Sequence, residues 1–182
     1  RAGQQAYTEL KNICVWAKTN GGMGSLYRSQ HEFIFVFKSG TGAHVNNVEL
    51  GKYGRNRTNV WPYPGATSFG DGRSDLALHP TVKPQQLVAD AILDCSNRGA
   101  IILDPFAGSG TTLLAAHQTG RRGFGIELDE KYCDVAVRRL REATGIDPVH
   151  VATGETFSDR EAAEAAIDSA ARPAARTEKG AA

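Results

Sequence analysis

The sequence has no long hydrophobic run, few cysteines and no internal repeat. No apolar segment approaches the ~20 residues of a membrane-spanning helix, and no signal-peptide pattern is present. Cys14, Cys95 and Cys133 lie far apart, without the spacing of metal ligands. We therefore expect reduced thiols, no metal site, no membrane association and a cytoplasmic protein. The sequence begins at Arg1 and its only methionine is Met23, so we expect it to be part of a longer polypeptide.

Charge is nearly balanced overall but unevenly distributed. The 182 residues carry a formal net charge of +1, and residues 1–75 contain nine Lys and Arg against five Asp and Glu. That basic part is the better candidate for contact with a polyanion. Residues 148–182 are Ala-rich and acidic, with one expected helix over 159–171 and a disordered last ten residues.

Residues 100–127 predict a strand, a glycine loop, a helix and a second strand. The apolar run 101–103 favours a strand buried on both faces of a parallel sheet. Gly108 and Gly110 allow a tight turn close to a ligand before a helix begins. Glu127 follows at the carboxyl end of the next strand, expected over 123–128. This arrangement is typical of a site for a nucleoside-bearing cofactor.

The glycine loop lacks two phosphate-binding signatures. The third glycine of the dinucleotide fingerprint is missing, and no Gly-Lys-Ser/Thr follows as in a P-loop. The loop alone could be a simple turn between a strand and a helix. Because the carboxylate of Glu127 can accept the hydroxyls of a ribose, we favour a cofactor that has a ribose but no pyrophosphate, rather than NAD.

Residues 1–38 predict the end of a helix over 4–10, a strand over 13–16 and a strand over 33–38. The last of these is apolar at every position from Phe33 to Phe37, which predicts burial on both faces. A glycine-rich loop covers 19–25.

Polar and aromatic residues gather before the strand at 33–38. His31 and Glu32 could form an acid/base pair, although a polar approach to a buried strand is the reading we favour. We interpret Arg28 as a phosphate or substrate-backbone contact and Tyr27 as a stacking surface.

Residues 39–75 have no apolar periodicity and interleave cations with aromatics and amides. Such a long irregular insertion suits nucleic-acid binding, with Lys52, Arg55 and Arg57 as candidate contacts, although a solvated loop would share this composition. We expect residues 61–64, Trp-Pro-Tyr-Pro, to pack the end of the insertion onto the domain.

The segment 79–84, His-Pro-Thr-Val-Lys-Pro, leads into an expected helix over 85–95. Because that helix precedes the strand at 101–103, Thr81 and Lys83 should lie near the edge that carries the glycine loop. A helix is also expected over 129–143, and its three arginines, Arg138, Arg139 and Arg141, are interpreted as a solvated face.

Three motifs, in this order, resemble the amino-DNA methyltransferases of the permuted β type. They are residues 79–84, residues 104–112 (Asp-Pro-Phe-Ala-Gly-Ser-Gly-Thr-Thr) and residues 125–129 (Gly-Ile-Glu-Leu-Asp). The resemblance covers residues 11–147. It implies methylation of N6 of adenine or, less favoured, N4 of cytosine with S-adenosyl-L-methionine, and a prokaryotic or phage restriction-modification context. The implied fold is α/β, a Rossmann-like methyltransferase sheet with helices on both faces, incomplete at its N-terminus.

The resemblance also implies site residues, partners and domains. We expect double-stranded DNA as partner, a methyltransferase domain over 1–147 with a target-recognition insertion over 41–75, and a tail over 148–182. The expected cofactor-binding residues are Thr81, Lys83, Asp104, Phe106, Gly108, Gly110, Thr111, Thr112 and Glu127. The expected DNA-binding residues are Arg28, Lys52, Arg55 and Arg57.

The family's catalytic tetrapeptide is missing from this sequence. Members carry Asp, Asn or Ser followed by Pro-Pro and an aromatic residue, which bind the flipped target base. No such tetrapeptide occurs here, so we place no catalytic residue in this chain, expect the motif upstream of Arg1 and predict that the chain alone is inactive. A homodimer is conceivable. A non-catalytic remnant that binds DNA or cofactor and a methyltransferase for RNA or a small molecule stay open as alternatives; a nicotinamide oxidoreductase is the least favoured.

Overall fold

The computed structural model describes residues 1–65 and 83–171. The chain divides into two units, Arg1–Leu140 and Arg141–Ala182. Predictions for Thr81, for the last part of the 41–75 insertion and for the final ten residues lie outside the described residues.

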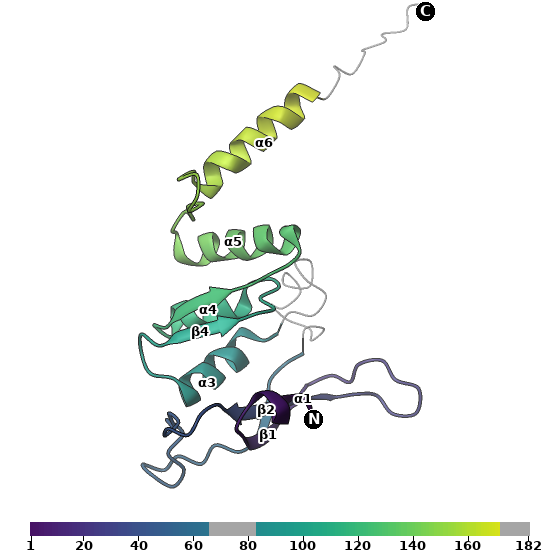
Figure 1. Cartoon of the computed structure of the whole chain (residues 1–182). Helices are drawn as coiled ribbons and strands as arrows, with labels where there is room; N and C mark the ends of the chain where they lie inside the picture. Colours follow the sequence, from purple (N-terminus) through teal and green to yellow (C-terminus); the bar gives the residue numbers. More distant parts are fainter. Residues whose placement is uncertain (66–82, 172–182) are drawn as a thin grey trace, which may run out of the picture. The chain divides into compact units, whose positions relative to one another are not determined.

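The first unit contains a three-stranded sheet with β1 at its centre (Figure 1). Strand β1 pairs antiparallel with β2 and parallel with β3. The elements are α1 (Ala2–Ala6), β1 (Glu9–Ala17), β2 (His31–Lys38) and β3 (Val60–Pro62). The N-terminal helix ends earlier than the predicted residue 10, because Tyr7 is already extended, and β1 begins earlier than the predicted strand at 13–16.

One face of this sheet packs on helix α3 (Gln85–Cys95). Cys14, Trp16 and Trp61 form a buried cluster with Leu87 of that helix. The indole N–H of Trp16 donates to the carbonyl of Tyr63 at 2.9 Å. The prediction that residues 61–64 pack the insertion onto the domain is therefore confirmed, and they do so partly as strand β3.

The other face of the sheet carries an aromatic row. The prediction that the strand at 33–38 is buried on both faces is wrong, because α3 covers only the face that holds Ile34 and Val36. Phe33 and Phe35 on the opposite face are more than half exposed. Their rings, with Phe37 and Tyr7, follow one another at centroid distances of 5.3 to 6.4 Å.

A second, two-stranded parallel sheet follows α3. It consists of β4 (Ile101–Asp104) and β5 (Arg122–Gly125), connected by helix α4 (Thr111–Gln118). Strand β5 is shorter than the predicted 123–128. Its glycines let α4 approach closely, since a Cβ atom on Gly123 would lie 3.2 Å from the Cβ of Ala116.

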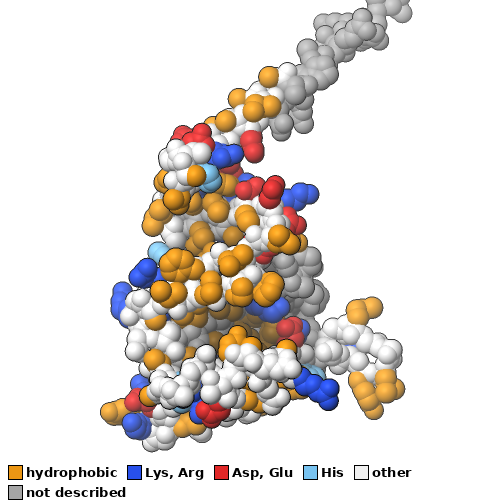
Figure 2. Space-filling view, in the orientation of Figure 1, with side chains coloured by type: hydrophobic (Ala, Val, Ile, Leu, Met, Phe, Trp, Pro, Cys, Tyr) orange, Lys and Arg blue, Asp and Glu red, His pale blue; other side chains and the backbone are white. Residues whose placement is uncertain are grey.

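The sheet of β4 and β5 is covered on one face only, within the part of the chain that the structure describes. Ile102 packs on a cluster of Ala89, Ile92, Ala115 and Ala116 from α3 and α4. Ile101 and Leu103 point to the opposite face and are each 62% exposed. Burial of this strand on both faces is thus a wrong prediction, because no described element covers the second face, where Figure 2 shows hydrophobic side chains.

Two further helices complete the described chain, α5 (Glu130–Thr144) and α6 (Phe157–Ala171). Helix α6 confirms the helix predicted over 159–171. Within the second unit, Arg141 forms an ion pair with Glu161 at 2.7 Å. Among the helices described here, none combines the length and apolar character required to cross a bilayer.

Candidate functional site

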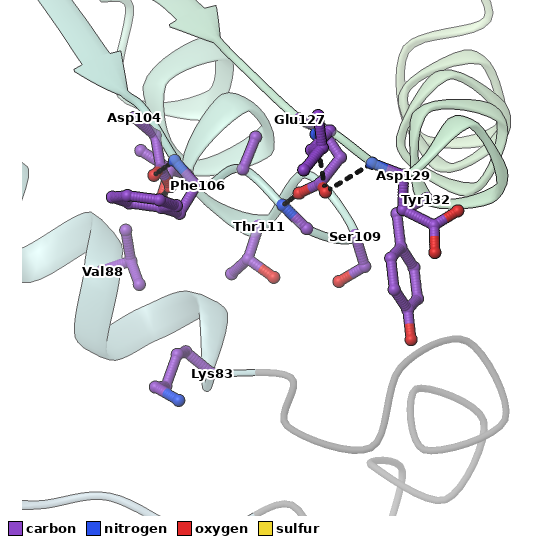
Figure 3. Close-up of a pocket in the computed structure, with 13 residues that line it drawn as sticks. Lys83, Val88, Asp104, Phe106, Ser109, Thr111, Glu127, Asp129 and Tyr132 are labelled. Atoms are coloured by element: carbon purple, nitrogen blue, oxygen red, sulfur yellow. Dashed lines mark hydrogen bonds between the residues drawn. The ribbon is translucent and has the colours of Figure 1, made fainter.

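A pocket of about 680 Å³ lies at the carboxyl ends of β4 and β5 (Figure 3). Loops at this edge of a parallel sheet commonly form ligand sites. The lining comes from the start of α3, the glycine loop, the end of β5 and the first turn of α5. The residues are Lys83, Val88, Asp104, Phe106, Ala107, Gly108, Ser109, Thr111, Thr112, Glu127, Leu128, Asp129 and Tyr132.

The carboxylate of Glu127 joins the glycine loop to the end of β5. It accepts the backbone N–H of Gly108 at 2.7 Å, of Leu128 at 2.9 Å and of Asp129 at 3.0 Å. Figure 3 shows these bonds converging on one side chain. A carboxylate held by three donors keeps one orientation, so Glu127 presents a fixed acceptor to a ligand in the pocket.

Asp104 braces the other end of the loop. Its carboxylate accepts the hydroxyl of Thr112 at 2.6 Å and the backbone N–H of Phe106 at 3.0 Å. Phe106 itself is exposed and lines the pocket. The end of β4 and the start of α4 are therefore fixed by one side chain.

The two glycines of the loop have left-handed backbone conformations. Gly108 has φ of 51° and Gly110 has φ of 79°, a region that residues with a Cβ atom rarely adopt. A Cβ atom on Gly110 would also lie 2.9 Å from the Cβ of Ala136 in α5. Both the backbone conformation and the lack of space for a Cβ atom therefore require glycine at position 110.

Arg139, on α5, bonds to the glycine loop. This contact was not predicted from the sequence. Its guanidinium donates to the carbonyl of Ser109 at 2.7 Å, to the Ser109 hydroxyl at 2.9 Å and to the Thr111 hydroxyl at 3.3 Å. The interpretation of Arg139 as part of a solvated face is wrong. Helical spacing offered a signal, since positions 132, 136 and 139 share one face of the helix.

Lys83 lies at the start of α3 and lines the same pocket. Its ammonium is 3.7 Å from the carboxylate of Glu32, which also pairs with Lys18 at 2.6 Å. The predicted nearness of Lys83 to the glycine-loop edge is thus observed. Glu32 therefore forms ion pairs with both Lys18 and Lys83. The neighbouring His31 lies edge-on to the ring of Phe33, with centroids 4.9 Å apart.

The insertion after β2 is anchored on α3. The guanidinium of Arg57 pairs with Asp94 at 2.7 Å and lies over the ring of Trp61 at 4.8 Å. Burial raises the pKa of Asp94, and the charge of Arg57 opposes that shift. Asn47, also missed from the sequence, donates to the carbonyls of Leu93 and Ser96 at 2.9 and 2.8 Å. These contacts hold the irregular segment at two points, Asn47 and Arg57, on α3 and the residue that follows it.

The other candidate DNA contacts lie at the surface. Lys52 is 3.6 Å from Glu49, and Arg55 pairs with the same carboxylate. Arg28 donates to the backbone carbonyls of Gly21 and Gly22. The four predicted cations therefore occupy two separate segments, the loop before β2 and the insertion after it. Within the described ranges, no group of His, Cys, Asp and Glu could hold a metal ion.

Curated relatives match about half of the chain. The type II methyltransferase M.ScaI of Streptomyces caespitosus is 46% identical over 89 residues, which are 48% of this chain and 29% of the relative. The DNA adenine methyltransferase YhdJ of Escherichia coli (strain K12) is 43% identical over 86 residues, 47% of this chain and 28% of the relative. The chain spans under a third of the length of these relatives.

Solved structures share the fold. The structure of an M1.HpyAVI–SAM complex aligns with a TM-score of 0.56 at 29% identity, covering 72% of this chain and 62% of that one. The matched structures are Rossmann-like methyltransferases. The predicted α/β, Rossmann-like fold class is confirmed by this likeness.

The family profile described as DNA methylase, N6_N4_Mtase, matches residues 3–138. This range includes the glycine loop, Glu127, Lys83 and the insertion. Members of this family use S-adenosyl-L-methionine to methylate DNA. Because the profile covers well over half of the sequence, the chain belongs to the N6/N4 DNA methylase family.

Proposed function

We propose that this chain forms the cofactor-binding and target-recognition portion of a site-specific DNA amino-methyltransferase that uses S-adenosyl-L-methionine. One observation carries the proposal: the carboxylate of Glu127 is fixed at the edge of the sheet beside a glycine loop that lines a pocket of about 680 Å³. This volume is in the range of small-molecule and cofactor sites. The family membership supports the same conclusion.

The pocket residues fit the chemical groups of S-adenosyl-L-methionine. Glu127 would accept the ribose hydroxyls, and Phe106 would lie against an apolar part of the ligand. Lys83 would attract the methionine carboxylate, with Thr81 beside it as the resemblance implies. Gly108 and Gly110 let the backbone approach the ligand, and the loop is braced by Asp104, Thr111 and Thr112.

The bound cofactor would supply an electrophilic methyl group on a sulfonium. The residues of this chain act by binding and orientation, because a nucleophile and a methyl group must meet in line. The acceptor would be the exocyclic amine of a base flipped out of the duplex. We propose adenine N6 ahead of cytosine N4, supported by the name of the relative YhdJ, a DNA adenine methyltransferase.

We assign DNA contact to Arg28, Lys52, Arg55 and Arg57. Lys52 and Arg55 share the carboxylate of Glu49, and they would exchange it for DNA phosphates. Arg57, the fourth of these cations, also anchors the insertion on α3 through Asp94. The assignment of residues 1–147 to the methyltransferase domain, with 41–75 as its recognition insertion, stays a prediction, as does the cytoplasmic location.

The catalytic tetrapeptide and a further part of the sheet would come from another segment of the same polypeptide. The sequence has no such tetrapeptide, the chain spans under a third of its curated relatives, and one face of β4 is open. The alternative is a second copy of the chain that covers that face in a homodimer.

Calorimetric titration of the chain with S-adenosylhomocysteine tests the proposed cofactor. We expect saturable binding that Glu127→Ala abolishes, because the variant loses both the ribose acceptor and the bonds that shape the loop. Glu142→Ala, on the exposed surface of α5, is the matched control and should bind as the parent does. Binding of NADH in preference to S-adenosylhomocysteine would contradict the proposal.

A further inference from the structure

The loop between β1 and β2, residues 18–30, projects from the sheet and ends in exposed hydrophobic side chains (Figures 1 and 2). Met23 is 97% exposed, Leu26 81% and Tyr27 85%. Single exposed apolar side chains are ordinary on a protein surface, but three large ones at the end of one projecting loop indicate an interaction site.

The base of the loop is ordered by hydrogen bonds. The backbone N–H of Lys18 donates to the carbonyl of Gln30 at 2.8 Å, and the N–H of Gly22 donates to Ser29 at 2.6 Å. The guanidinium of Arg28 donates to two carbonyls across the loop. These bonds hold the two sides of the loop together. The loop therefore has a fixed shape, and its apolar residues lie away from the sheet.

The turn at the tip is tight. A Cβ atom on Gly24 would lie 2.1 Å from the carbonyl oxygen of Tyr27, so only glycine allows this backbone path. The turn brings Met23 into the same short segment as Leu26 and Tyr27. The three exposed apolar side chains therefore belong to one short stretch of the loop, residues 23–27.

The charge of the loop suits a polyanion. Residues 18–31 contain no Asp or Glu, and they include Lys18 and Arg28. The hydrogen bonds of Arg28 go to neutral carbonyls, which leave its positive charge in place. Because Lys18 is paired with Glu32, the positive charge of the loop comes from Arg28. An apolar tip beside this cation matches a DNA duplex, whose phosphates surround an apolar stack of bases.

The loop also begins beside the candidate cofactor pocket. Glu32, directly after the loop, pairs with Lys18 on one side and with Lys83 on the other. Lys83 lines the pocket. The stem of the loop and the pocket are therefore connected through a single carboxylate.

We propose that residues 18–30 form a DNA wedge. Met23, Leu26 and Tyr27 insert between stacked bases next to the methylation target, and Arg28 contacts the adjoining phosphate. The wedge occupies the space from which the target base is flipped and lowers the cost of keeping it outside the stack. This inference rests on the proposed function, since it requires that the chain act on duplex DNA.

Binding to a duplex with a central abasic site, compared with the intact duplex, tests the wedge. Both labelled duplexes are titrated with the full chain in the presence of S-adenosylhomocysteine. Because an abasic site already offers the gap, we expect the parent chain to bind it about tenfold more tightly than the intact duplex. The triple variant Met23→Ser, Leu26→Ser, Tyr27→Ser should bind both duplexes with equal affinity, whereas Tyr27→Phe should keep the preference.

The control replaces Val151, which is 99% exposed in the second unit, by Ser, and it should behave as the parent does. Equal abasic-site preference in the parent and the triple variant would overturn the wedge alone. If the parent bound S-adenosylhomocysteine but neither duplex, both the wedge and the DNA half of the proposed function would fail. If the triple variant lost self-association in sedimentation while keeping its DNA preference, the tip would be a protein contact and the wedge would be excluded.

Discussion

Arg139 bonds to the glycine loop but does not line the pocket. Its replacement therefore tests how the shape of the loop, rather than direct contact with the ligand, affects binding. Arg139→Met removes the bonds to the carbonyl and hydroxyl of Ser109, a residue that is 5% exposed. We expect an approximately tenfold loss of S-adenosylhomocysteine affinity and a free energy of unfolding lower by about 1 to 3 kcal/mol, because buried acceptors lose a charged donor. Calorimetry and urea unfolding measure the two effects.

The control for Arg139 is Lys131→Met on the exposed surface of the same helix, which should leave both quantities unchanged. Ser109→Ala should add little to Arg139→Met, because residues that share one interaction are not additive. If the two changes lowered the affinity additively, Arg139 would not act through the loop.

Stability should fall at alkaline pH because of one buried and one partly buried group. Burial raises the pKa of the Cys14 thiol and of the Tyr63 hydroxyl, which also donates to Asp90. Their folded-state pKa values lie above the unfolded ones, so their contribution to stability is complete below about pH 8.5 and is lost as the pH rises further. Urea unfolding should therefore give a lower free energy of unfolding at pH 10 than at pH 8, with a smaller difference in Cys14→Ala. A free energy that rose over this range would contradict the assignment.

Residue roles were predictable from the sequence where the cause is local. Gly110 and Glu127 belong to one short strand–loop–helix–strand pattern, and their positions follow from it. Arg139 and Asn47 act on partners that are 30 and 49 residues away in the sequence. Composition cannot specify such pairs, because an arginine on a helix face has the same local signature whether it is solvated or bonded.

At the scale of elements, strand β5 packs closely against the glycine loop. A Cβ atom on Gly125 would lie 2.9 Å from the Cβ of Ala107, inside that loop. Gly125→Ala should therefore displace the loop, lower the free energy of unfolding by about 1 to 3 kcal/mol as overpacking does, and weaken S-adenosylhomocysteine binding. Thermal melting and calorimetry report both.

Gly42→Ala is the matched control for this substitution, since a Cβ atom there would have no neighbour within 4 Å. It should change neither melting temperature nor affinity. Unaltered binding in Gly125→Ala would show that the loop does not depend on this packing.

Periodicity predicts where the strands lie, but it does not predict which of their faces are buried. The apolar runs at 33–37 and 101–103 form β2 and β4, yet both strands have an exposed apolar face in the described chain. Periodicity reports that a segment is apolar on both sides, and burial depends on which elements then cover it. The same limit explains β3, whose parallel pairing with β1 joins residues far apart in sequence.

At the scale of the whole molecule, two separate sheets replace the single sheet expected of a Rossmann-like fold. Strand β4 pairs with β5 alone, and β3 pairs with β1 alone, in the described residues. Ile101 and Leu103 lie on the open face of β4. Hydrophobic surface of this kind is stabilised when another element covers it, which is the physical basis for a complementing segment.

Methyl transfer should therefore depend on a longer polypeptide. We expect the 182-residue chain to transfer no labelled methyl group from S-adenosyl-L-methionine to DNA, because its sequence lacks the tetrapeptide that binds the target amine. A polypeptide extended upstream to include such a tetrapeptide should be active, and the amides of β4 should exchange more slowly with deuterium. Nucleoside analysis of the product distinguishes N6-methyladenine from N4-methylcytosine.

Activity of the 182-residue chain would contradict the assignment of catalysis to the added segment. An extended polypeptide that binds cofactor and DNA without turnover would identify a non-catalytic remnant.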